Sequence, residues 1–170
     1  MPKIGRYRVR LLVSNMGMDI NPFELSIKEL CTVNGIDKKS AQQIKNYNDF
    51  DFGIQELEAA AKSGISIVSF WDDHYPMLLK KIYNPPVVLY CKGQKLQYKE
   101  DVVAIVGTRR FTPYGKSVTQ RLTSDLISNN ITIVSGLARG IDTIAHRTTV
   151  EGGGRTISVL GSGIDVIYPA

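Results

Sequence analysis

Glycine, hydroxyl and arginine residues gather in three short stretches of the sequence. The first is Gly107-Thr108-Arg109-Arg110, the second is Ser135-Gly136 with Arg139 close behind, and the third is Gly161-Ser162-Gly163. Glycine leaves backbone amides accessible, and the planar, permanently charged guanidinium of arginine matches the geometry of phosphate. These residue types at these positions predict an anion-binding site.

Each of the three stretches follows a short apolar run that is typical of a buried strand. The runs are residues 102–106, 131–134 and 156–160, and β-branched side chains dominate them. Such runs suit strands of a parallel sheet that are buried on both faces. Right-handed crossovers place the carboxyl ends of parallel strands on one side of the sheet. The three stretches are therefore expected to converge on one phosphate-binding rim.

Helix signals lie between the expected strands. Thr112 and Pro113 open a helix that runs to about residue 128, and Asp142 can cap a second helix that stops at the glycines of residues 152–154. The first helix has apolar positions at helical spacing, which are predicted to face the sheet: Val118, Leu122, Leu126 and Ile127. The pattern predicts an α/β fold, a Rossmann-like parallel sheet with helices on both faces, over residues 64–170.

A small helical domain is expected before the sheet, over residues 1–63. Helices are predicted at residues 7–16, 23–33, from about 37, and 55–62, followed by strands at 65–70 and 87–90 around a short helix at 77–82. Residues 30–46 resemble a helix-hairpin-helix, which grips a DNA backbone through its turn, with Lys38, Lys39 and Lys45 nearby. Its turn carries Asp37 where the motif prefers glycine, so packing of a helical pair is the favoured interpretation.

Composition and charge restrict the class of protein. The 170 residues are 43% hydrophobic, and a mean hydropathy of −0.08 is typical of a soluble globular chain. No apolar run approaches the roughly 20 residues of a membrane span, and residues 1–10 lack the apolar core of a signal peptide. Cys31 and Cys91 are isolated, which favours reduced thiols. The net charge is +5, and six of the seven basic residues after Asp101 are arginines, of which Arg121 and Arg147 read as helix-surface residues.

Three other patterns look like chemistry but are better explained as structure. Gly115-Lys116-Ser117 matches the end of an ATP-binding loop, yet Arg110 stands where that loop requires glycine. Asp142 and His146 lie four residues apart with no nucleophile beside them, so a local capping and packing pair is favoured. Asp72-Asp73-His74 is read as a turn rather than a metal site, and no cofactor or metal is expected.

Several of these motifs together resemble the DprA/Smf family of DNA-processing proteins of natural transformation. The resemblance rests on residues 105–109, 112–115, 135–142, 145–146 and 154–169, and more weakly on Asp73-x-Tyr75-Pro76 and Pro85-Pro86. It implies a cytoplasmic, non-catalytic protein that binds single-stranded DNA cooperatively, forms a homodimer and helps load the RecA recombinase. It also implies that the sequence stops after the first half of the Rossmann-like domain, with the RecA surface outside it.

The resemblance assigns a phosphate-gripping role to Gly107, Thr108 and Arg109, and a second contact to Ser135 and Gly136. Arg110 and Arg139 are expected to widen the positive rim. Phe111 or Tyr114 either stacks a DNA base or packs against a helix.

Two alternative functions stay open at this point. One is a nucleotide-binding enzyme of the same Rossmann-like superfamily, a base-releasing hydrolase, although its glycine-rich segment is missing from residues 1–170. The other is DNA binding through the residue 30–46 hairpin alone.

Overall fold

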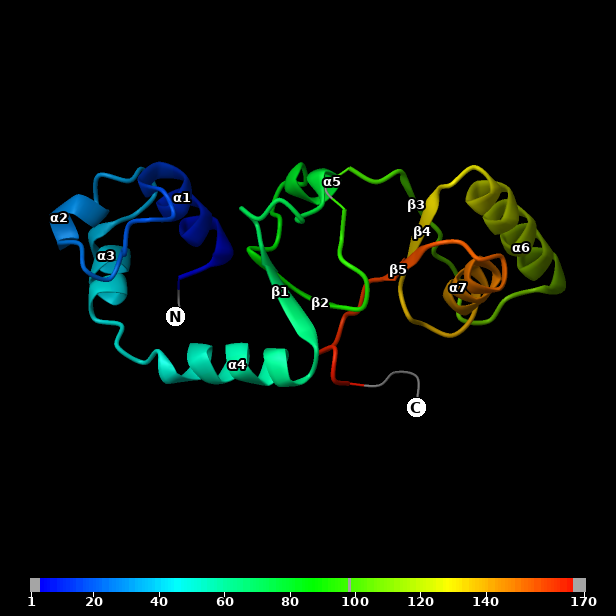
Figure 1. Cartoon of the computed structure of the whole chain (residues 1–170). Coiled ribbons are helices and arrows are strands. Elements are labelled where there is room, and N and C mark those ends of the chain that lie inside the picture. Colours follow the sequence, from blue (N-terminus) through cyan, green and yellow to red (C-terminus); the bar gives the residue numbers. More distant parts are fainter. Residues whose placement is uncertain (1–3, 98, 167–170) are drawn as a thin grey trace. The chain divides into compact units, whose positions relative to one another are not determined.

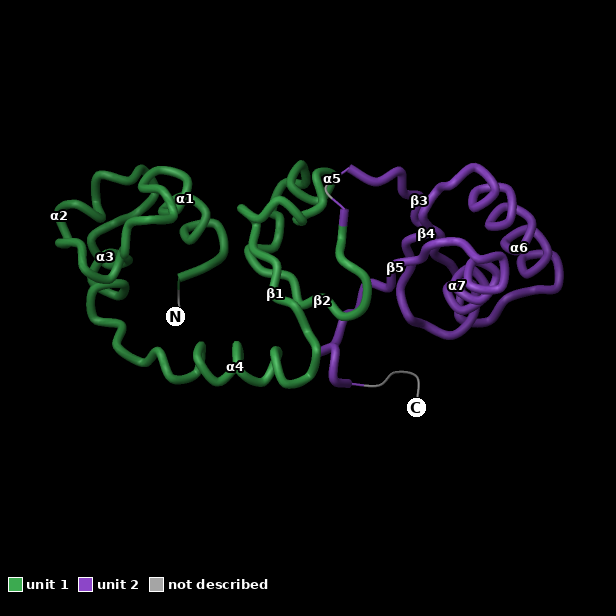
Figure 2. Tube along the Cα trace, viewed as in Figure 1, with its two compact units in different colours: residues 1–96 green, residues 97–170 purple. Residues whose placement is uncertain are grey.

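The computed structural model of the chain describes residues 4–97 and 99–166, arranged as two compact units, Met1–Leu96 and Gln97–Ala170 (Figure 2). The division follows Leu96, whereas the sequence predicts a boundary near Gly64, so a domain spanning residues 64–170 stays a prediction. Within the described residues no helix combines the length and apolarity needed to cross a bilayer.

The first unit begins with three helices around a small apolar core. They are α1 (Arg6–Met16), α2 (Ile27–Leu30) and α3 (Lys38–Lys45), and Leu30 and Ile44 between them are fully buried (Figure 1). The helix predicted over residues 23–33 is wrong in extent. Ser26 and Glu29 form a capping box, so the helix starts only at Ile27 and lasts a single turn.

The rest of the first unit is a helix and a two-stranded antiparallel sheet. Helix α4 (Asp51–Lys62) leads into β1 (Ile65–Ser69), which pairs with β2 (Val88–Lys92), and α5 (Met77–Lys80) lies between the strands in sequence. The Tyr75 ring is fully buried and its hydroxyl donates to the Pro86 carbonyl at 2.8 Å. The weaker tyrosine–proline motif of the sequence therefore has a structural role, holding the connection between the strands.

The second unit contains the predicted parallel sheet. Strands β3 (Val102–Ala104), β4 (Thr132–Ser135) and β5 (Thr156–Ser158) lie in that order, and both neighbouring pairs are parallel. Helix α6 (Pro113–Ser128) connects the first pair and α7 (Ile141–Glu151) the second. The parallel α/β fold is confirmed, and the carboxyl ends of all three strands lie at one edge.

Both connecting helices lie on the same face of the sheet. They pack against each other and against β4 (Figure 1). Helices on the opposite face, also expected from the sequence, are not supplied by the described residues. Accordingly β3 is not buried on both faces, because Ala104 is exposed, and the strand is shorter than the predicted run of residues 102–106.

The buried stripe of α6 differs from the predicted one. Val118 and Leu122 are exposed, whereas Thr119 and Thr123 face inward beside the half-buried Leu126 and Ile127. Thr119 satisfies its hydroxyl by donating to the Gly115 carbonyl within the helix, which lets a polar residue occupy the inner face. Hydrophobicity alone therefore misplaced the stripe at Val118 and Leu122, whereas Leu126 and Ile127 pack against the core as predicted.

Candidate nucleic-acid interface

The segment after β3 forms the first part of the predicted rim. A Cβ at Gly107 would lie 2.7 Å from the Ile141 side chain, so glycine allows the start of α7 to approach the strand end. The Gly107 amide points to the Asp142 carboxylate at 3.4 Å. The Thr108 hydroxyl accepts from the Arg110 amide at 3.2 Å and so fixes a tight turn. Arg109 and Arg110 are exposed at this turn.

The end of β4 is tied to β3 rather than open to solvent. The Ser135 hydroxyl is buried and donates to the Ile105 carbonyl. At the next residue, a Cβ on Gly136 would lie 2.6 Å from a carboxylate oxygen of Asp142. In this structure the Ser135 hydroxyl holds the two strand ends together, and its predicted contact with phosphate stays a prediction.

The loop between β4 and α7 lies directly on the turn after β3. Gly140 has φ of +96°, and a Cβ there would be 2.2 Å from the Thr108 carbonyl oxygen and 2.7 Å from the Cα of Arg109. The Ile141 amide donates to the same Thr108 carbonyl at 3.2 Å. The backbone of Arg139 and Gly140 is thus brought beside that of Arg109. We call residues 107–110 and 135–140 the strand-tip ledge.

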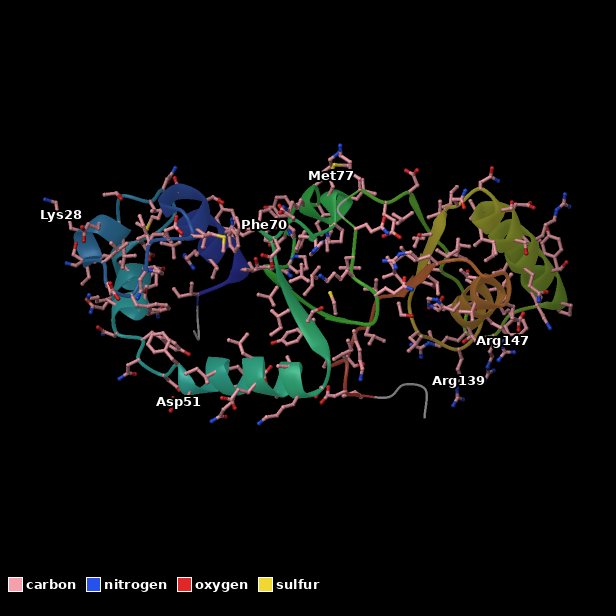
Figure 3. All side chains as sticks on the ribbon, in the orientation of Figure 1. Lys28, Asp51, Phe70, Met77, Arg139 and Arg147 are labelled. Carbon is pink, nitrogen blue, oxygen red and sulfur yellow. The ribbon has the colours of Figure 1, made fainter. Side chains whose placement is uncertain are left out.

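Exposed arginines give the strand-tip ledge its charge. Arg109, Arg110 and Arg139 are all exposed, and Figure 3 shows Arg139 pointing away from the ribbon. Among the described residues the side chains of Arg109 and Arg110 form no ion pair or hydrogen bond. By contrast, Arg155 forms an ion pair with Glu100, which precedes β3 in sequence. Arg155 therefore neutralises a carboxylate and is not part of the ledge.

Two residues that sequence reasoning treated as a local pair connect α7 to the strand ends. Asp142 and His146 do not form a hydrogen bond with each other. The Asp142 carboxylate accepts from the Gly107 amide, and the His146 Nε2 donates to the Gly136 carbonyl at 2.7 Å. The His146 Nδ1 lies 2.7 Å from the Thr156 hydroxyl of β5. Their spacing of four residues, which places both on one helix face, was the available signal. The two side chains position the ledge.

The remaining predicted contacts are more exposed. Tyr114 is 79% exposed and Phe111 is 43% exposed, so neither ring is committed to the core, and both are accessible for stacking. The third strand is shorter than predicted: β5 ends at Ser158, although the Val159 amide still donates to the Ser135 carbonyl. Tyr168 and Pro169, which carry the end of the resemblance, lie outside the described residues.

The residue 30–46 hairpin is used for packing, as the sequence favoured. A Cβ at Gly35 would lie 2.7 Å from the Leu11 side chain of α1, and the Asp37 carboxylate caps α3 by accepting from the Ser40 amide at 2.7 Å. Lys45 donates to the carbonyls of Phe23 and Glu24. The turn and one of its three lysines are therefore occupied by intramolecular contacts.

Comparisons with known proteins give a consistent result. The family model described as "DNA recombination-mediator protein A" matches residues 66–170. A relative from Streptococcus pneumoniae, "DNA processing protein DprA", is 45% identical over 146 residues, covering 86% of this chain and 50% of the relative. The chain spans half or less of the length of this relative and of those from Bacillus subtilis and Synechocystis.

Solved structures agree with the sequence matches. The X-ray structure of DprA from Streptococcus pneumoniae superposes with a TM-score of 0.74 at 28% identity, covering 98% of this chain and 56% of the other. A structure of DNA processing protein A from Helicobacter pylori, described as giving insight into a unique single-stranded DNA binding mode, has a TM-score of 0.54 at 36% identity. It covers 62% of this chain and 46% of that protein.

Proposed function

Since the chain belongs to the DNA recombination-mediator protein A family, we propose that it binds single-stranded DNA through the strand-tip ledge in the processing of DNA for natural transformation. The observation that carries the proposal is the pair of exposed guanidinium groups of Arg109 and Arg110, which have no carboxylate partner among the described residues. The Helicobacter pylori relative, described by its single-stranded DNA binding mode, supports the choice of ligand.

The ledge suits a backbone contact that does not depend on base sequence. Guanidinium groups pair with phosphates, which every nucleotide supplies, and such contacts release counterions and weaken with salt. Phe111 follows Arg110 directly in sequence and Tyr114 lies three residues further on; both exposed rings offer faces for unstacked bases. Unpaired bases are available only on a single strand, which gives the preference over duplex.

The rest of the proposed role follows the family. In this proposal the DNA-binding role is non-catalytic and cytoplasmic and helps to load RecA, whereas the homodimer is expected of full-length family members. We propose that the RecA and dimer surfaces belong to the part of the family members that lies outside this chain, which spans 38% and 50% of two relatives. Release of free base from a panel of nucleotides would contradict the non-catalytic part of the proposal.

Fluorescence anisotropy with labelled oligo-dT tests the DNA contact. Arg109→Ala should weaken binding by about 1–3 kcal/mol, the scale of a lost hydrogen bond to a charged group. The slope of log K against log salt should fall by about 0.7, as expected for one lost phosphate contact on a single strand.

Arg121→Ala is the matched control, because Arg121 is also an exposed arginine but lies on α6 outside the ledge. Its affinity and salt slope should equal those of the parent. Equal binding by Arg109→Ala and the parent protein would remove Arg109 from the interface.

A further inference from the structure

A polar cleft lies between α6 and α7, next to the strand-tip ledge. Its walls are contributed by both helices, and its floor is the buried Ile144. The lining residues with charged or hydrogen-bonding side chains are Lys116, Gln120, Thr143, Arg147, Thr148 and Glu151. The Thr143 hydroxyl donates to the Ala138 carbonyl at 2.8 Å, which joins the wall of the cleft to the loop that carries Arg139.

The charges of the cleft are ordered along the two helices. Both helices return from the end of one parallel strand to the start of the next, so both begin at the ledge. Lys116 is the fourth residue of α6 and Arg147 the seventh of α7, whereas Glu151 is the last residue of α7. At 1.5 Å per residue, Arg147 lies about 9 Å along the axis from the first residue of α7. The end of the cleft nearer the ledge is therefore the cationic end.

The charged side chains of the cleft are unpaired within residues 4–97 and 99–166. Among the described residues, the side chains of Lys116, Arg147 and Glu151 make no ion pair or hydrogen bond, although all three line the same cleft. Two uncompensated cations over an apolar floor, with hydroxyl and amide groups around them, form a site complementary to an anion that is also a hydrogen-bond acceptor. A phosphodiester group has both properties.

We propose that this cleft holds a further backbone phosphate of the single strand that the ledge binds. The strand then continues from the carboxyl ends of β3 and β4 along the groove between α6 and α7. Lys116 and Arg147 pair with the phosphate, Gln120 and Thr143 flank it, and Glu151 repels the strand at the far end. This inference rests on the proposed function and extends it by giving the strand a direction.

Oligonucleotide length separates the cleft from the ledge. The full chain is titrated with labelled oligo-dT of about 4 and about 16 nucleotides, which bracket common single-strand site sizes. The double variant Lys116→Gln/Arg147→Gln should bind the long oligonucleotide roughly threefold to tenfold more weakly, with its salt slope lowered by about 0.7 for the one phosphate that the cleft no longer holds. Its affinity for the short oligonucleotide should equal that of the parent, because the ledge alone can hold it.

Two further variants sharpen the test. Glu151→Gln should strengthen long-oligonucleotide binding by up to about twofold, a typical effect of one exposed charge. Arg121→Gln removes an arginine of α6 that does not line the cleft and should leave both affinities unchanged. Circular dichroism of each variant checks that these surface substitutions preserve the fold.

The outcomes distinguish the two proposals. If the double variant binds the long oligonucleotide as tightly as the parent while Arg109→Ala weakens both lengths, the cleft proposal is overturned and the ledge survives. If the double variant loses affinity equally for both lengths, the cleft is not a separate subsite and the proposal is also overturned. If Arg109→Ala and the parent bind both lengths equally, the proposed function itself fails.

Discussion

Gly140→Ala is the substitution that should disturb the strand-tip ledge most. Two properties of the site oppose a side chain there. The residue has φ of +96° and ψ of −132°, a region that is accessible almost only to glycine. The added Cβ would also lie 2.2 Å from the Thr108 carbonyl oxygen, and a backbone atom cannot rotate away as a side chain can.

Three other glycines of the second unit separate these two effects. At Gly161 the φ is ordinary and nothing lies within 4 Å of the added Cβ, so alanine should be neutral or stabilise by up to about 1 kcal/mol. At Gly153 the φ is +71° in open space, so alanine should cost about 1 kcal/mol from the backbone alone. At Gly107 only the Ile141 side chain interferes, and repacking it should cost about 1–3 kcal/mol.

Gly140→Ala combines both penalties and should exceed about 3 kcal/mol, the upper end of the strain typical of one disfavoured backbone conformation. Hydrogen exchange of the α7 amides, followed by mass spectrometry, measures the free energy of opening in this unit without relying on a chain-wide transition. Gly140→Ala should also weaken binding of oligo-dT, whereas Gly153→Ala should not. A loss of opening free energy in Gly140→Ala no larger than in Gly153→Ala would refute the contact between the loop and the turn.

Three more predictions concern stability. The Thr123 hydroxyl is buried without a hydrogen-bond partner among the described residues, so Thr123→Val should stabilise by about 1 kcal/mol in urea denaturation; Thr149→Val, whose hydroxyl donates to Ala145, should gain less. Glu100→Gln should lower the free energy of unfolding by about 3 kcal/mol, since the largely buried Glu100 carboxylate accepts from both Arg155 and Thr132. An unchanged free energy of unfolding in the same assay would contradict this. Hydrogen bonds from the Ser40 side chain and, to a smaller extent, from the Ser40 backbone amide hold the pKa of Asp37 below its ordinary value of 3.8. The ionised carboxylate therefore stabilises the folded state above pH 3.8, and this contribution is lost as the pH falls through the lower folded-state pKa. Asp37→Asn keeps the cap, and its thermal midpoint should fall less on acidification than that of the parent; equal falls would exclude Asp37 as the source.

The sequence predicted the parallel sheet well because its signals are local and strong. Uninterrupted β-branched runs, the Thr112–Pro113 helix start and glycines after each strand all agree, and parallel pairing then brings the strand ends to one edge. Residue identity alone also placed Arg109 and Arg110 at that edge.

The errors arose where polar side chains occupy a buried helix face, cap a helix or make contacts distant in sequence. Thr119 and Thr123 occupy the inner face of α6 that hydrophobicity assigned to Val118 and Leu122. The capping pair Ser26 and Glu29 starts α2 at Ile27, later than the apolar spacing predicts. The links from Asp142 and His146 to the strand ends depend on how α7 lies on the sheet, which periodicity does not specify.

Asp142 and His146 have a mechanical consequence for the interface. Asp142 in the first turn of α7 accepts from the Gly107 amide after β3, and His146 in the second turn donates to the Gly136 carbonyl after β4. Because both contacts come from one helix, they hold the two loops at a fixed separation. The backbone of the two loops is thereby held in place before any ligand arrives, so association would mainly have to order the exposed arginine side chains. Under the proposed function, a ledge whose backbone is fixed in this way would present its arginines to phosphates, which every nucleotide carries whatever its base.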